Sequence, residues 1–145
     1  MADFNLLIRE RFFIDSEPRG GDYNLTIKNV THSDNRVLNI PSGSEVELFN
    51  LSDTVGPGTF VTSSLKYARI TNLSVSHSIN LRVSSSNENI NFDVVPGGSF
   101  LLSSAQITGS VEGGANPLLG YDNIASIKCE PSSSDCRVEY FLVTS

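Results

Sequence analysis

The amino-acid sequence predicts an all-β protein, an antiparallel β-sandwich of about ten short strands with a jelly-roll-like arrangement. Apolar and polar residues alternate with a period of two along most of the chain, which is typical of half-buried strands. Ser, Thr, Asn and Val are abundant and Trp is absent, a composition that favours sheets and turns over helices. A chain of 145 residues can bury one core, so residues 1–145 are expected to form a single domain.

The expected strands are the segments of alternating or continuous apolar character. They lie near residues 4–14, 25–30, 37–40, 44–51, 58–64, 67–74, 78–83, 90–95, 99–104, 107–111, 123–129 and 136–144. Between them are stretches rich in the residues that turns require, such as SEPRGGD, PSGS, SSSNEN and EPSSSD.

Two hairpins can be aligned residue by residue. Pairing Val83 with Ile90 across SSSNEN makes one face of the first hairpin wholly apolar, which fixes its register. That face consists of Ile79, Leu81, Val83, Ile90, Phe92 and Val94.

The second expected hairpin closes at EPSSSD and pairs Cys129 with Cys136. The partners that follow on the same face are again apolar, namely Ile127 with Val138 and Ala125 with Tyr140. The run 138–143 is apolar on both faces except at Glu139, so this strand is expected to be central in its sheet.

Cys129 and Cys136 leave three interpretations open. They can be small buried hydrophobic residues, or they can form a cross-strand disulfide if the protein matures in an oxidising medium. A metal site is the weakest alternative, because the spacing is not C-x-x-C and a second pair of ligands is missing.

The stretch PGGS at residues 96–99 is expected to be a turn and not a phosphate-binding loop. A phosphate-binding loop needs a following Lys and a helix, and the sequence has neither at this place. Pro96 suits the first central position of a type II turn, and Gly97 suits the second, where φ is positive.

No enzymatic activity and no cofactor are expected. The two histidines, His32 and His77, lie in turn-like stretches without the H-x-H or H-x-E spacing of metal-dependent β-barrel enzymes. A G-x-S-x-G nucleophile motif is absent from the sequence. Glu45 and Glu47 share one face of an expected strand, which is typical of a solvated sheet face.

Charge and hydropathy exclude several classes of partner. The formal net charge is −6 and the ten basic residues are scattered singly, so nucleic-acid binding is not expected. No apolar stretch has the length of a membrane span. The N-terminus lacks the basic start and long apolar centre of a signal peptide.

Residues 1–22 admit two interpretations, a first strand with a long loop or an arm that docks on a neighbouring subunit. The run DFNLLIRERFFI is apolar enough to need burial, and DSEPRGGD after it has the composition of a flexible connection. In the second interpretation the docking residues are the large apolar ones of this run. They are Phe4, Leu6, Leu7, Ile8, Phe12 and Phe13.

A resemblance is carried by residues 67–102, which contain YARITN, LRV and the run F-x-V-x-P-G-G-S-F-L-L, and by the terminal EYFLVTS. In this pattern of strands and turns the C-terminal half resembles small β-rich virion structural proteins of tailed bacteriophages. Those are capsid decoration (cement) proteins, head fibres and knobs. The resemblance implies a non-enzymatic structural role and assembly at symmetry axes.

The expected function is that of a capsid decoration or cement protein that stabilises the viral head. The expected partners are the major capsid protein or another virion protein, together with copies of the chain itself in a trimer or dimer. The expected location is the virion, after synthesis in the host cytoplasm.

The alternative function is a lectin-like or host-adhesion module, associated with a tail or fibre, that binds sugars or surface proteins through its loops. The loop residues it would use are Tyr23, Asn116, Tyr121 and Asp122.

Overall fold

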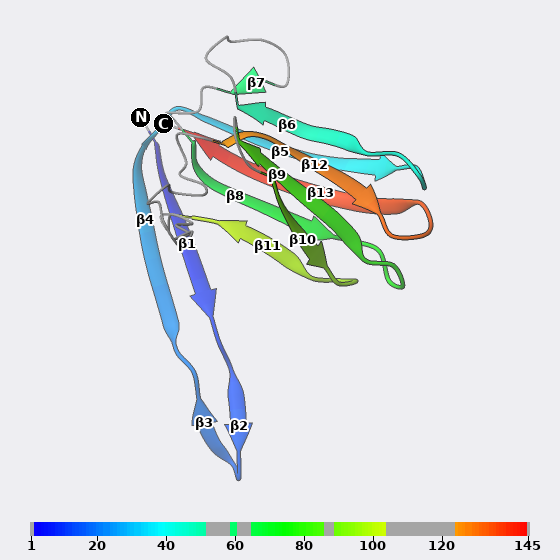
Figure 1. Ribbon diagram of the computed structural model, residues 1–145. Coiled ribbons are helices and arrows are strands. Elements are labelled where there is room, and N and C mark those ends of the chain that lie inside the picture. The colour runs from blue at the N-terminus through cyan, green and yellow to red at the C-terminus, as the bar shows by residue number, and fades with distance from the viewer. Residues whose placement is uncertain (1, 52–58, 61–64, 86–88, 104–123, 145) are drawn as a thin grey trace, which may run out of the picture.

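The computed structural model describes residues 2–51, 59–60, 65–85, 89–103 and 124–144. These residues form thirteen strands and no helix, which confirms the all-β class (Figure 1). The strands are β1 (Ala2–Arg9), β2 (Phe12–Ile14), β3 (Glu17–Arg19), β4 (Asp22–Val30), β5 (His32–Ile40), β6 (Val46–Leu51), β7 (Thr59–Phe60), β8 (Leu65–Asn72), β9 (Ile79–Ser85), β10 (Asn89–Val94), β11 (Ser99–Leu102), β12 (Ile124–Pro131) and β13 (Cys136–Thr144). The expected strand at 107–111 lies outside the described residues.

Nine of these strands form two sheets that pack face to face (Figure 1). The four-stranded sheet has the order β11-β8-β13-β5, and the five-stranded sheet has the order β10-β9-β12-β6-β7. All neighbours are antiparallel except β6 and the two-residue β7. The predicted antiparallel β-sandwich is therefore confirmed.

The core lies between the two sheets and consists of their inward-facing side chains. Ile70 and Leu142 come from the four-stranded sheet, Leu81 and Ile127 come from the five-stranded sheet, and all four are fully buried. Because burying one such side chain contributes about 1.5–3 kcal/mol, packing between the sheets is the main source of stability.

The first hairpin forms with the predicted register. β9 and β10 pair Val83 with Ile90, and the remaining partners on that face follow as expected. On the polar face of this hairpin the charged side chains have partners. Arg82 forms an ion pair with Glu45 at 3.0 Å, while the neighbouring Asp93 accepts a hydrogen bond from Asn80.

The second predicted hairpin is wrong, because β12 and β13 belong to different sheets. β12 lies between β9 and β6, whereas β13 lies between β8 and β5. The residues from Ser132 to Asp135 carry the chain across the sandwich and not back along the same sheet. Ala125 is exposed, because a register shift between Ile124 and Ser126 turns it outward. The central position predicted for the C-terminal strand is confirmed.

The turn predicted at PGGS is confirmed. It connects a strand of one sheet to a strand of the other sheet, and it does not close a hairpin within one sheet. Gly97 has a φ of 72°, and the Gly98 N–H donates to the Val95 carbonyl at 2.9 Å, as a type II turn requires. β10 before the turn is an edge strand of the five-stranded sheet, and β11 after it is an edge strand of the four-stranded sheet.

The buried side chain of Asn72 stabilises the chain connections around this turn. It is fully buried and donates to the carbonyls of His77 and Val94, at 2.8 and 3.1 Å. Its side-chain oxygen accepts a hydrogen bond from the Ser74 N–H at 3.0 Å. The buried amide is therefore fully partnered, and it ties the β8–β9 connection to the β10–β11 connection.

The N-terminal residues form a long hairpin in which β1 pairs with β4 and β2 pairs with β3. The flexible connection expected at residues 15–22 is not observed, because this stretch contains the hairpin turn and β3. Asp15 and Ser16 form the turn with φ of 49° and 67°, the two positive values that a tight two-residue hairpin turn needs.

Candidate functional site

The N-terminal hairpin, residues 2–30, projects from the sandwich and is called the arm below (Figure 1). Its base is attached to the outer face of the four-stranded sheet by stacked aromatic rings. The ring of Phe4 lies 5.1 Å from that of Tyr67 and 5.6 Å from that of Phe141. Tyr67 is only 3% exposed although it points away from the core, and this burial raises its pKa. The arm therefore has a fixed base.

The two faces of the arm differ in polarity. Ile8 lies opposite Tyr23 and Leu6 lies opposite Leu25, so one face is apolar along β1 and β4. On the other face Thr26 donates a hydrogen bond to Asn5 at 2.8 Å, and Arg9 forms an ion pair with Asp22 at 2.9 Å. Alternation along the strands separates the two sets of side chains.

Exposure of the apolar side chains rises from the base of the arm to its tip. Phe4 and Leu6 are half-buried, while Leu7 and Ile8 are exposed. At the tip Phe12 is 60% exposed and Phe13 is 67% exposed. All six residues proposed from the sequence thus lie in the arm, but Phe4 packs on the protein's own sandwich and the tip residues do not.

Two further exposed apolar residues of the arm were not proposed from the sequence. They are Ile14 at the turn and Tyr23, which is 62% exposed. Tyr23 was assigned to a loop that binds sugars, whereas it lies in β4 opposite Ile8. Only the strand register, with the turn at Asp15 and Ser16, could have placed it there.

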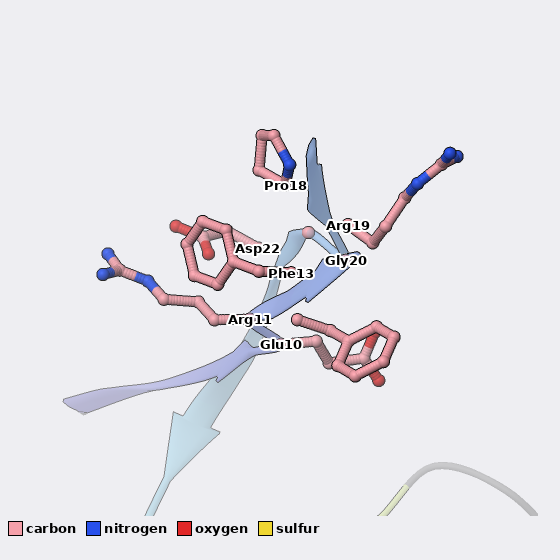
Figure 2. A pocket seen from close by; sticks show the side chains of 9 residues that line it. Glu10, Arg11, Phe13, Pro18, Arg19, Gly20 and Asp22 are labelled. Carbon is pink, nitrogen blue, oxygen red and sulfur yellow. The ribbon is translucent and has the colours of Figure 1, made fainter. Parts of the chain in front are cut away.

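A shallow hollow lies beside the tip, where the β1–β4 ladder passes into the β2–β3 ladder (Figure 2). The Glu10 N–H donates to the Gly21 carbonyl at 3.0 Å and connects the two ladders. Gly20 has a φ of 100°, and a Cβ there would lie 2.5 Å from the Glu10 carbonyl oxygen. A residue with a side chain would therefore distort the arm at this point.

A second surface depression lies at the end of the sandwich where three sheet-to-sheet connections meet. The Ser133 hydroxyl and His77 Nδ1 are 2.9 Å apart, and the Ser42 N–H donates to Asp135 at 2.8 Å. Leu73, Val75 and Arg137 also line the depression. These polar groups mainly connect one loop to another. Of the other loop residues proposed for sugar binding, Asn116, Tyr121 and Asp122 lie outside the described part of the chain.

The candidate catalytic groups are not brought together. His32 lies opposite Thr144 at one end of β5, whereas His77 lies in the loops at the other end of the sandwich. Glu45 is neutralised by Arg82 and by Lys128, at 3.0 and 3.7 Å. Within the described residues no group of three or more His, Cys, Asp or Glu side chains could hold a metal ion.

Cys129 and Cys136 are both buried and both free in the structure. They come from opposite sheets, because β12 and β13 face each other across the core. Burial, with a smaller contribution from Cys136, raises the pKa of Cys129 to about 12. The Cys136 thiol donates to the Ser134 carbonyl at 3.3 Å. A thiol held in its neutral form is a poor nucleophile.

Comparison of the chain with protein-family models, with curated proteins and with solved structures gives no match. Among the described residues there is no helix long and apolar enough to cross a bilayer.

Proposed function

We propose that the protein is a non-enzymatic virion structural protein, a capsid decoration or cement protein that stabilises the head. The observation that carries the proposal is the projecting arm with Phe12 and Phe13 exposed at its tip. Apolar groups of this size on a projecting element typically mark a contact with another protein. The arm thus has the properties of an assembly element.

The order of the strands supports a jelly roll, which we propose as the topology of the sandwich. Six pairs of successive strands have their members in different sheets, and they are β5–β6, β7–β8, β8–β9, β10–β11, β11–β12 and β12–β13. Viral capsid proteins, lectins and cupins share this two-sheet architecture. The architecture alone therefore leaves several functions open, and the exposed arm favours the assembly function among them.

The mechanism requires many weak contacts repeated by symmetry. A rigid sandwich places the arm, and each copy contacts the major capsid protein and a neighbouring copy in a trimer or dimer. Contacts that are weak singly add when several copies bind one particle.

Attachment to capsids tests this function. The purified chain is mixed with undecorated capsids of the virus that encodes it, and bound protein is counted after sedimentation. Saturation at a fixed number of copies per capsid, with greater resistance of the heads to heat, is expected. A chain that stays in the supernatant at all concentrations contradicts the proposal.

A lectin-like or host-adhesion module is the second candidate, and the depression at the loop end favours it. Exposed Leu73 and Val75 beside Ser and Asp135 groups combine apolar and polar contacts, as sugar-binding surfaces do. Binding on a glycan array that is lost in Asp135→Ala, with no capsid attachment, would favour this candidate over the first.

A further inference from the structure

We infer that the arm binds the arm of a second copy of this chain. The inference rests on the proposed assembly role of the arm and deepens it by naming the neighbour. The two arms overlap in opposite directions and bury between them the face that carries Phe12 and Ile14.

One face of the arm supplies much of the area that such a contact needs. Four large apolar side chains of this face are at least 41% exposed, and they are Ile8, Phe12, Ile14 and Tyr23. Together they expose roughly 400 Å², if a whole large side chain is taken as about 200 Å². A stable interface buries about 800 Å² from each partner, polar rim included. The apolar side chains of this face therefore supply about half of such an interface, and the polar side chains beside them supply its rim.

The backbone of the arm also favours a partner of the same kind. Among the described residues β1 pairs only with β4, and β2 pairs only with β3, so each ladder has two free edges. A two-stranded ribbon is only marginally stable in water. A free edge presents N–H and C=O groups that the edge of an identical strand can pair with.

The low net charge of the arm favours a second copy of the chain over a strongly charged partner. Residues 2–30 contain four basic and five acidic side chains, so the arm accounts for only −1 of the net charge of −6. The sandwich bodies therefore repel each other, and the arms hardly do.

The charged groups near the tip are complementary to their own copy. Within the described residues neither Arg19 nor Glu17 forms an ion pair inside the chain. Glu17 lies nearer the turn than Arg19, and both lie on one side of β3. When two arms overlap in opposite directions, Glu17 of each arm comes close to Arg19 of the other.

The molar mass of the isolated full chain tests the inference. Light scattering after size exclusion at about 50 μM is expected to give twice the chain mass of 15.7 kDa. The double variant Phe12→Ser, Phe13→Ser is expected to weaken association at least about 30-fold, since aromatic residues dominate such interfaces. The matched control is Val95→Ser, which removes an apolar side chain that is 61% exposed on the sandwich and should not change the mass.

A charge exchange tests the arm-to-arm geometry. Arg19→Glu alone and Glu17→Arg alone are each expected to weaken self-association several-fold, because like charges then meet. An equimolar mixture of the two variants is expected to associate as well as the unchanged chain.

Two outcomes overturn the inference: a monomeric full chain, or a double variant that melts normally and keeps its oligomeric mass. A monomer that still saturates capsids would assign the arm to the capsid protein and leave the virion function intact. An oligomer that ignores capsids would contradict the virion function alone.

Discussion

The arm and the sandwich are built from the same secondary structure, yet their apolar residues have opposite environments. In the sandwich, inward-facing residues such as Leu142 are fully buried between two sheets. In the arm, Phe13 and Tyr23 lie on a ribbon that has no second sheet to cover it. The difference shows that the alternation of apolar and polar residues specifies a strand and its two faces. Whether the apolar face is buried depends on whether a second sheet packs against it. The sandwich should therefore govern stability, and the arm should govern association.

The largest expected effect comes from removing β13. A chain that ends at Ser134 loses the central strand between β5 and β8, together with the buried Val138 and Leu142. It is expected to lose cooperative thermal unfolding altogether, as measured by circular dichroism.

The control for this truncation is a shortened arm. Residues 10–21 are replaced by Asn-Gly, which can close the hairpin because Arg9 lies opposite Asp22. This chain should melt cooperatively near the unchanged temperature. If the chain that ends at Ser134 and the chain with the shortened arm both fail to fold, the arm is part of the cooperative folding unit. The contrast between a stabilising sandwich and an associating arm is then wrong.

A pair of single substitutions sharpens the contrast. Leu142→Ala leaves a cavity in the core and is expected to lower the free energy of unfolding by about 2–5 kcal/mol. Phe13→Ala removes a larger side chain from the arm and should change it by less than about 0.5 kcal/mol. Urea denaturation of both variants at low protein concentration measures the difference. Equal losses would mean that the arm packs against a core of its own.

The substitution Asn72→Ala tests how much the buried hydrogen bonds of this side chain contribute to stability where the two sheets are connected. The substitution leaves the carbonyls of His77 and Val94 without their partner and should cost about 1–3 kcal/mol. Asn80→Ala is the control, because Asn80 makes a single exposed hydrogen bond to Asp93. A loss for Asn72→Ala no greater than that for Asn80→Ala would show that water replaces the buried amide.

Alkaline pH should destabilise the sandwich through its buried acids. The Cys129 thiol has its ordinary pKa of 9.0 when the chain is unfolded and a pKa of about 12 when it is folded. Its contribution is therefore present below pH 9 and is lost as the pH rises from 9 toward 12. Burial and the hydrogen bond to Asp34 raise the pKa of Tyr140 and act in the same direction. Urea midpoints at pH 8 and pH 10 test this, and Cys129→Ala should show the smaller decline.

Thiol counting gives the smallest signal and tests the disulfide alternative. A colorimetric thiol reagent should react slowly with the folded chain and should detect both Cys129 and Cys136 once the chain is unfolded without reductant. A count of zero after unfolding would establish a disulfide across the two sheets.

The sequence was sufficient to predict the strand positions and the register of one hairpin. It was insufficient to predict where the chain crosses from one sheet to the other. The alternation of Ile79, Leu81 and Val83 fixed the hairpin with β10, because only one register placed all apolar residues on one face. The same test failed for Cys129 and Cys136. Two strands that face each other across a core also present matching apolar faces, so a pattern of faces cannot distinguish a hairpin from a crossing between sheets.

The arm was only half predictable for a related reason. The apolar run around Phe12 and Phe13 indicated a segment that needs burial, and its exposure in the structure agrees with that need. The return strand was missed, because Pro18 and Gly20 have the composition of a loop and Asp15-Ser16 is not a common hairpin turn. Its positive φ values are visible only in the structure.

The place of β13 in the four-stranded sheet has a consequence for synthesis. The strand pairs with β5, which lies about a hundred residues earlier in the chain. The four-stranded sheet therefore cannot close until β13 has left the ribosome. The strands of the arm pair only within residues 2–30, so both strands of each arm ladder leave the ribosome long before β13 does. Pairing within the arm therefore does not depend on β13, whereas closure of the four-stranded sheet does.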